Sequence, residues 1–386
     1  MKKYVLFLFI IFLLNLFNFN HIYFVKGEEN VLELNSSSYC LMEPSSKTVI
    51  ISNNEHKRLY PASMTKMMGL YLILEAIENK EISLNDQVIV SKFAASMGGT
   101  QIFLEENEKM SVEDLFKSVA INSANDAIVA LGEHLCSSNS AFIERMNKKA
   151  KEFGMNDTNF VNATGFDDEN HYTSPYDMAL LGSYLVGFDD KILKYSSMQE
   201  GYIRENTSSP FWLVNTNKLL KYYNGMDGLK TGFTSKAGYN LTATAKRNGV
   251  RLVSTVMNLD TIEHRSQDTI RLLDYGFSKL KCISMFEKNE VVATFEINKM
   301  LNVYLKAIIK ENVEVVIDKT EEQNDIDVQV NLLKISDCYI KDEMIGELIL
   351  TTKSNKRYVY TIYAGNDVKK QNFFTYLLNF LHLIFV

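Results

Sequence analysis

The segment Arg58-Leu59-Tyr60-Pro61-Ala62-Ser63-Met64-Thr65-Lys66 joins an extended region to a helical one. Before it, short runs that alternate apolar and polar residues, separated by a turn at residues 44–46, predict a β-hairpin within residues 28–60. From Ser63 to Lys80 the apolar residues recur at helical spacing instead. Ser63 and Lys66 therefore stand one helical turn apart near the start of a helix, with their side chains on the same face.

More helices follow, and each has a recognisable start or end. Ser111 precedes acidic residues and predicts a capped helix N-terminus. Another helix begins near Asp126, and the next spans Ser140 to Phe153, with Gly154 just past its end. Ser174-Pro175-Tyr176-Asp177 supplies a cap, a proline in the first turn and an acid, and this combination opens one more helix.

Strands return after residue 210. Tyr239–Ala245 and Val250–Val256 flank the pair Asn248-Gly249, which predicts a hairpin. A helix from about Ser266 to Leu280 follows. This order of elements indicates an α/β fold of the α+β type over residues 28–282, in which an antiparallel sheet packs with a helical cluster.

Residues 283–365 have a different sequence pattern. Their apolar runs are short, rich in β-branched residues and evenly spaced. We predict a small all-β domain there, without a catalytic cluster. Its clearest strands are expected at Val291–Phe295, Val313–Ile317, Val328–Leu332 and Tyr358–Tyr363.

Composition excludes several classes of protein. The chain has 386 residues, of which 46% are apolar and 23% charged, with four prolines and a net charge of −6. These values suit globular domains with a sizeable core, and they exclude a disordered or collagen-like chain and the basic surface of a nucleic-acid-binding protein. The sequence contains neither a metal-ligand cluster nor a glycine-rich phosphate loop, so we expect no metal and no other cofactor.

Both ends of the chain indicate export to a membrane surface. Lys2 and Lys3 precede an apolar run, which predicts a secretory signal peptide over residues 1–27; a retained N-terminal anchor is the alternative. Residues 366–386 end in an apolar segment whose polar residues fall on one helical face. This segment is too short to span a bilayer, so we expect it to lie in the membrane interface, with packing on the protein's own core as the alternative.

The expected location is therefore extracytoplasmic, on the outer face of the cytoplasmic membrane. Disulfides are permitted in such a compartment. The cysteines, however, are far apart and form no C-x-x-C pair, so we expect free, mostly buried thiols at Cys40, Cys136, Cys282 and Cys338.

Three short motifs occur in order within residues 28–282. Ser63-Met64-Thr65-Lys66 opens a helix, Ser123-Ala124-Asn125 lies between two helices, and Lys230-Thr231-Gly232 precedes the strand hairpin. Each motif alone is weak evidence, because Ser278 also stands three residues before a lysine and Ser-x-Asn recurs elsewhere. Their order and their structural context supply the specificity.

The motif residues suit acyl transfer through a serine ester. A serine hydroxyl needs a base beside it, and Lys66 can serve only when neutral. Neutrality at pH 7 costs a free lysine about 4.6 kcal/mol, because its ordinary pKa is about 10.4. Burial and a nearby positive charge can lower a lysine pKa by about 3–5, and Lys230 is a candidate for that charge.

The remaining motif residues have plausible partners on a substrate. Ser123 can relay a proton to a leaving amine, and Asn125 can hold a substrate amide. Lys230 and Thr231 can bind a terminal carboxylate, while a glycine next to them lets an extended substrate approach the backbone. The backbone N–H groups of Ser63 and Phe233 are candidate oxyanion donors, and each such donor contributes about 2.7–4 kcal/mol.

In these motifs the chain resembles the low-molecular-mass penicillin-binding proteins, a family of serine-type D-alanyl-D-alanine carboxypeptidases. The resemblance covers residues 38–280, and it continues more weakly to the C-terminus. It rests on the segments 58–66, 123–127, 171–179 and 227–234. It implies a penicillin-binding/β-lactamase-like catalytic domain that removes the terminal D-alanine from peptidoglycan stem peptides and that β-lactams inhibit by forming the same ester.

The resemblance also implies roles for individual residues. The catalytic residues would be Ser63, Lys66 and Ser123. The substrate-binding residues would be Asn125, Lys230, Thr231, Gly232, Phe233, Thr234 and Arg265. Arg265 has an alternative as a surface arginine at a helix start, and His171 is expected to be a structural hydrogen-bonding residue. Many relatives carry histidine where this chain has Phe233, so the pH profile and the side-chain selectivity stay open.

Two other functions are compatible with these motifs. A β-lactamase would need an efficient deacylation base, typically a glutamate with its own motif, and none is identifiable. A membrane-held protein that only binds wall peptides would not need all three motifs intact.

Overall fold

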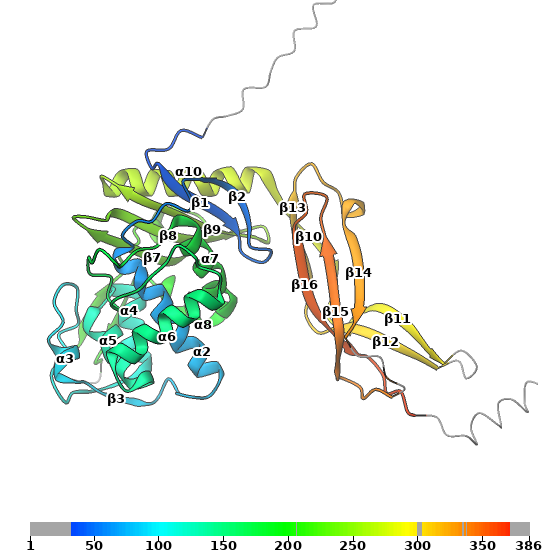
Figure 1. The fold of residues 1–386 in the computed structure, drawn as a ribbon, viewed down its shortest axis with the longest axis horizontal. Helices are drawn as coiled ribbons and strands as arrows, with labels where there is room; N and C mark the ends of the chain where they lie inside the picture. Colours follow the sequence, from blue (N-terminus) through cyan, green and yellow to red (C-terminus); the bar gives the residue numbers. More distant parts are fainter. Residues whose placement is uncertain (1–31, 206, 299–302, 334–335, 337, 371–386) are drawn as a thin grey trace, which may run out of the picture. The chain divides into compact units, whose positions relative to one another are not determined.

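The computed structural model describes residues 32–205, 207–298, 303–333, 336 and 338–370, and Figure 1 shows its fold. The described residues from Leu34 onward belong to one compact unit. The predicted signal peptide lies outside the described residues, as does most of the expected C-terminal membrane segment. The proposed domain boundaries therefore stay predictions.

An antiparallel sheet of five strands forms the centre of the first part of the chain. Its order is β2–β1–β9–β8–β7, so β7 lies at one edge. The strands are β1 (Ser38–Glu43), β2 (Thr48–Asn53), β7 (Met226–Thr234), β8 (Gly238–Arg247) and β9 (Val250–Leu259). In the register of β1 and β9, Cys40 faces Thr255, so residues from the two ends of this region pair directly.

Helices cover both faces of this sheet (Figure 1). Gly182 of α7 (Pro175–Leu185) packs on Val253, whereas Gly276 of α10 (Ile262–Lys279) packs on Leu252. Because successive strand residues point to opposite faces, the two helices lie on opposite sides of the sheet. The other helices are α2 (Lys66–Glu78), α3 (Lys92–Ala95), α4 (Val112–Asn122), α5 (Asn125–Cys136), α6 (Asn139–Glu152), α8 (Asp189–Ser196) and α9 (Leu219–Tyr222), with the 3-10 helices η1 (Ala62–Thr65) and η2 (Val186–Phe188).

Local sequence signals account for several of these boundaries. Ser111 and Ser174 accept backbone N–H bonds from the third residue beyond them, as a capping serine does, and so start α4 and α7. Asn248 and Gly249 both have positive φ, which is the conformation that a two-residue hairpin turn requires. The helix expected from Ser266 begins earlier because Thr261 caps α10.

Two short two-stranded ribbons border the helices. One pairs β3 (Gln87–Ile89) with β4 (Lys109–Ser111), and the other pairs β5 (Glu200–Ile203) with β6 (Phe211–Val214). Neither ribbon was expected from the sequence, because each strand is too short to show a pattern.

The C-terminal part is built from strands, as its sequence predicts. A second five-stranded sheet has the order β11–β12–β16–β15–β14. Its strands are β11 (Val291–Asn298), β12 (Val303–Ile309), β14 (Asp327–Leu332), β15 (Met344–Thr351) and β16 (Arg357–Ala364). A separate pair joins β10 (Leu280–Phe286) to β13 (Val313–Asp318), and the 3-10 helix η4 (Gln323–Asp325) precedes β14.

The expectation about the cysteines is partly wrong. All four thiols are free, but Cys40 alone is buried, Cys136 and Cys282 are half-buried, and Cys338 is exposed. Cys338 lies outside the strands, in the connection between the strands Asp327–Leu332 and Met344–Thr351. Within the described residues, no helix is both long and apolar enough to cross a membrane.

Candidate active site

Ser63 and Lys66 meet at the junction of η1 and α2. Lys66 Nζ lies 2.9 Å from Ser63 Oγ and donates a second hydrogen bond, of 2.6 Å, to the carbonyl oxygen of Thr164. The Lys66 side chain is fully buried. A serine hydroxyl and a buried amine at this distance are arranged as a nucleophile and its base.

The backbone around Ser63 is held tightly from two sides. Gly165 has a φ of +89°, and a Cβ atom there would lie 1.9 Å from the carbonyl oxygen of Ala62. At Gly232 of β7, a Cβ atom would lie 2.6 Å from the carbonyl oxygen of Pro61. Both positions therefore need glycine, because the chain that carries Ser63 passes directly against them.

Asn162 orders the loop that reaches Lys66. Its Oδ1 atom accepts backbone N–H bonds from Thr164, Gly165 and Phe166, at 3.2, 2.7 and 3.1 Å. The loop thereby turns the Thr164 carbonyl toward the Lys66 amine. Sequence reasoning missed Asn162 and Thr164, because neither belongs to one of the three motifs and Thr164 acts through its backbone carbonyl.

Burial and like charge shift the pKa values in this site. Burial holds the pKa of Lys66 well below its usual range, and Lys230 lowers it further, while Asp126 opposes the shift. Burial, followed by the nearby Arg265, lowers the pKa of Lys230 to about 7. A neutral Lys66 has a lone pair that can accept the Ser63 proton, so the arrangement provides the neutral base that the chemistry requires.

The second motif lies between α4 and α5, as expected. Ser123 has a φ of +70°, and its buried Oγ has no hydrogen-bond partner among the described residues. Asn125 is also buried and donates from Nδ2 to the carbonyl oxygen of Gly98 at 2.7 Å. A buried hydroxyl without a partner is uncommon in a folded protein, and it is available to a bound substrate.

The third motif forms part of the edge strand β7, which precedes the β8–β9 hairpin as expected. The Lys230 side chain is buried, and Thr231 Oγ1 lies 2.7 Å from the hydroxyl of Thr216. Thr234 Oγ1 donates to Asp167 Oδ1 at 2.7 Å and accepts the N–H of Ala237. The hydroxyl of Thr234 is therefore occupied within the protein, and its role toward a substrate stays a prediction.

Arg265 lies in the first turn of α10, but it is not a surface residue. Its side chain is 5% exposed, and its Nε has no hydrogen-bond partner among the described residues. Burial lowers its pKa to about 10. The alternative of an ordinary surface arginine is therefore wrong, because packing at the end of the sheet covers the guanidinium group.

Phe233 and His171 differ in exposure. The ring of Phe233 is 53% exposed and stacks on Tyr239 with a centroid distance of 4.3 Å. His171 is buried, with Nδ1 accepting the N–H of Val161 and Nε2 lying 2.8 Å from the hydroxyl of Thr65. Burial lowers its pKa to about 4, so it is a neutral structural residue, as expected.

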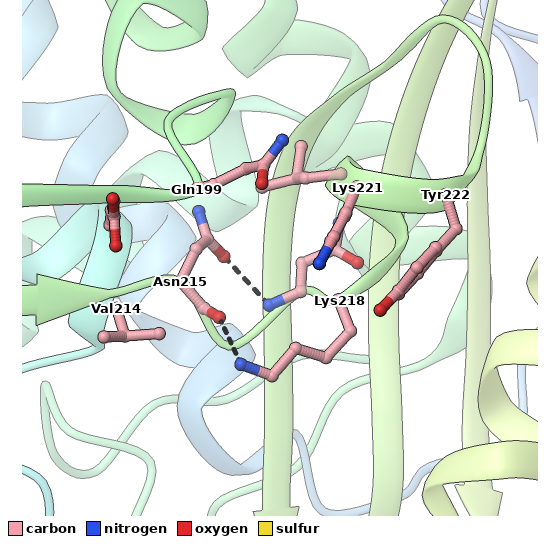
Figure 2. Close-up of a pocket in the computed structure, with 9 residues that line it drawn as sticks. Gln199, Val214, Asn215, Lys218, Lys221 and Tyr222 are labelled. Atoms are coloured by element: carbon pink, nitrogen blue, oxygen red, sulfur yellow. Dashed lines mark hydrogen bonds between the residues drawn. The ribbon is translucent and has the colours of Figure 1, made fainter.

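A separate cavity of about 440 Å³ lies beside the third motif (Figure 2). Asn215 and Asn217 line it, and the residue between them, Thr216, is the partner of Thr231. Figure 2 shows Asn215 bound to the ammonium group of Lys218 on one side of the cavity. None of the motif residues lines this cavity, so it is distinct from the site around Ser63.

The fold brings residues of the three motifs together around Lys66, and Arg265 lies near Lys230. Lys66, Lys230 and Arg265 are the basic side chains of this site, and no group of three or more metal-ligating side chains occurs in the described part of the chain. A serine hydroxyl in contact with a buried lysine, near a second lysine on an edge strand, is typical of the active-serine class of acyl-transferring enzymes.

Comparison with known proteins assigns the family within that class. Residues 25–261 match the family described as D-alanyl-D-alanine carboxypeptidase, and the chain belongs to this family. It is 38% identical to the D-alanyl-D-alanine carboxypeptidase DacF of Bacillus subtilis over 343 aligned residues. The alignment covers 89% of this chain and 88% of DacF.

Solved structures agree with this family. Penicillin binding protein 5 from Haemophilus influenzae has a TM-score of 0.69 and 29% identity, covering 87% of this chain and 98% of that one. Penicillin-binding protein D2 from Listeria monocytogenes, in its ampicillin-bound form, has a TM-score of 0.57 and 32% identity. That match covers 64% of this chain and 99% of the Listeria chain. The expected fold class and the assignment as a serine-type D-alanyl-D-alanine carboxypeptidase are confirmed.

Proposed function

We propose that the chain removes the terminal D-alanine of peptidoglycan stem peptides through an acyl-enzyme on Ser63. The observation that carries this assignment of roles is the 2.9 Å contact between Ser63 Oγ and the buried Lys66 amine. In the first step Ser63 Oγ attacks the carbonyl carbon of the peptide bond, and its proton passes to the neutral Lys66 Nζ. The backbone N–H groups of Ser63 and Phe233 stabilise the oxyanion that forms.

The leaving group needs a proton as the carbon–nitrogen bond breaks. The hydroxyl of Ser123 has no hydrogen-bond partner within the part of the chain that the structure describes, so it can pass a proton from Lys66 to the amine of D-alanine. Water then attacks the ester on Ser63, gives a proton to Lys66, and leaves the shortened peptide with a free carboxylate. The leaving oxygen of Ser63 takes that proton back, so the enzyme returns to its starting state.

The proposed specificity for the C-terminal residue of a peptide follows from the basic side chains of the site. Among the described residues, neither Lys230 nor Arg265 has a carboxylate within ion-pair distance, although both side chains are buried. A buried cation without a counter-ion is unfavourable, so an incoming carboxylate is stabilised strongly there. Thr231 lies on the same strand and adds a hydroxyl donor, so a peptide with a free C-terminal carboxylate fits best.

β-Lactams would react at the same serine. Their ring amide takes the place of the scissile peptide bond, and the acyl group stays on Ser63 because the amine remains tethered to it. The ampicillin-bound form of the related Listeria monocytogenes protein supports this expectation for the family. No observation favours a β-lactamase or a non-catalytic binding protein for this chain.

Location is proposed from the sequence. Family members act on the wall, so we infer that the chain works outside the cytoplasmic membrane. Export would use residues 1–27, and residues 366–386 would hold the protein on the membrane surface.

The test is mass spectrometry of the intact, mature protein after incubation with a penicillin, followed by peptide mapping of the adduct. We expect one adduct, on the peptide that contains Ser63. Ser63→Ala should abolish it, whereas Ser278→Ala, which changes the chance Ser-x-x-Lys match, should leave it unchanged. An adduct that survives Ser63→Ala would overturn the proposal.

A further inference from the structure

Phe103 combines an unfavourable backbone with an exposed aromatic side chain. Its φ is +57°, and its side chain is 65% exposed. A bulky residue in the left-handed region is strained, and an exposed phenylalanine gains little from the protein's own core. Such strain persists only where the surrounding structure enforces it, and it is concentrated at functional sites.

A buried carboxylate holds the backbone on both sides of Phe103, and so fixes its left-handed conformation. Asp126 is fully buried, and its carboxylate accepts the N–H of Ile102 at 3.0 Å and the N–H of Leu104 at 3.1 Å. Ile102 and Leu104 are buried, so the residue between them is turned outward. Asp126 directly follows Asn125 of the second motif, and the N–H of Asn125 donates to Thr100 in the same loop.

An arginine also binds the loop that contains Phe103. Arg204 Nη1 donates to the carbonyl oxygen of Ile102 at 2.8 Å, and its guanidinium forms a two-point ion pair with Glu108. Arg204 follows β5, so the loop is held between α5 and the β5–β6 ribbon. The ring of Phe103 comes to rest 6.0 Å from the ring of Phe211, at the start of β6.

The position of Phe211 relates this pair to the substrate. Thr216, which contacts Thr231 in the third motif, is five residues after Phe211, and this length of chain spans at most about 17 Å. A terminal dipeptide is about 7 Å long. An extended pentapeptide of about 17 Å, bound by its carboxylate near Thr231, is therefore long enough to reach the Phe103–Phe211 pair.

We propose that Phe103 is a specificity-determining residue that packs on the apolar part of the stem peptide upstream of the terminal D-Ala-D-Ala. This inference rests on the proposed function and adds to it a preference for long over short peptides. Asp126 and Arg204 are positioning residues, which act by holding Phe103 in place.

The test compares kcat/KM for two peptides: N-acetyl-D-Ala-D-Ala, which ends before Phe103, and a stem pentapeptide ending in D-Ala-D-Ala. Phe103→Gly removes the ring and also relieves the strained backbone. We expect it to lower kcat/KM for the pentapeptide about fivefold, to change that for the dipeptide less than twofold, and to leave the melting temperature equal or higher. Phe103→Tyr keeps an aromatic ring and should retain the preference.

Tyr304→Ala, which removes an exposed ring on β12, is the matched control and should change neither rate. Equal effects of Phe103→Gly on both peptides, or no effect on either, would overturn the inference while wild-type turnover still upholds the proposed function. Wild-type protein that cleaves neither peptide would overturn the proposed function itself.

Discussion

The hydroxyl oxygen of Thr216 lies 2.7 Å from the hydroxyl oxygen of Thr231. Thr231 belongs to the third motif, whereas Thr216 comes from the connection after β6 and is flanked by two buried asparagines. Those asparagines bond to the backbone at Ser196 and Gly228, which fixes the connection. The contact between the two threonines therefore sets the direction of the Thr231 hydroxyl, which belongs to the proposed carboxylate site.

Replacing Thr216 should weaken substrate binding more than it slows the chemistry. In Thr216→Val the hydroxyl of Thr231 loses its partner and is free to turn away from the carboxylate. We expect KM for a peptide ending in D-Ala-D-Ala to rise about threefold to tenfold, as for the loss of one hydrogen bond, with kcat changed little. Thr216→Ser keeps the hydroxyl and should behave like the wild type; an unchanged KM in Thr216→Val would contradict the role.

The charge on Lys230 should govern the alkaline side of the pH profile. Its pKa is lowered to about 7, so the amine loses its proton, and its attraction for a carboxylate, as the pH rises through about 7. We expect kcat/KM to fall across that range for a peptide with a free C-terminal carboxylate. A peptide amidated at its C-terminus should react slowly but without this fall. The same fall with both peptides would exclude Lys230 as its cause.

Gly165 should tolerate no side chain, whereas Gly154 should. Both have positive φ, but a Cβ atom at Gly154 meets nothing within 4 Å, while one at Gly165 lies 1.9 Å from the carbonyl oxygen of Ala62. Gly154→Ala should cost about 1 kcal/mol of unfolding free energy and keep full acylation by a fluorescent penicillin. Gly165→Ala should cost clearly more and slow acylation at least tenfold, because Ser63 follows Ala62. Equal behaviour of the two variants in urea unfolding and acylation would contradict this.

His171 should make the fold sensitive to acid. Its pKa is lowered from 6.5 to about 4 in the folded protein, so the unfolded chain binds the proton more readily. Its contribution to stability is complete above pH 6.5 and is lost as the pH falls toward 4, by about 3 kcal/mol in all. His171→Asn, which keeps an acceptor for Val161, should be less stable at pH 7 but less sensitive to acid in urea unfolding. An identical pH dependence in both proteins would refute the assignment.

Elements with local signals could be predicted from the sequence. Serine caps defined the starts of α4 and α7, and Asn248-Gly249 defined the β8–β9 hairpin, because in these cases neighbouring residues determine the backbone. The motifs themselves were recognisable because chemistry demands particular side chains. Their meeting around Ser63 could be inferred only from the order in which they occur.

Other features depend on contacts that no local pattern encodes. Thr216 has no motif, and Thr164 acts through its carbonyl oxygen, so nothing in the sequence marks either as part of the site. The burial of Arg265 follows from packing at the end of a sheet, which a helix start does not reveal. The short ribbons β3–β4 and β5–β6 exist because the helices around them fix their partners.

The pairing of β1 with β9 sets a condition on the timing of assembly. Cys40 and Thr255 are adjacent in the sheet but are 215 positions apart along the chain. A polypeptide threaded through a membrane from its N-terminus must present its first hairpin long before the strand that completes it arrives, and contacts of such long range make folding slow. A chain cut short before β9 cannot close the sheet. If residues 1–27 direct export as proposed, covalent labelling by a penicillin should therefore appear only late in export, when the fold is complete.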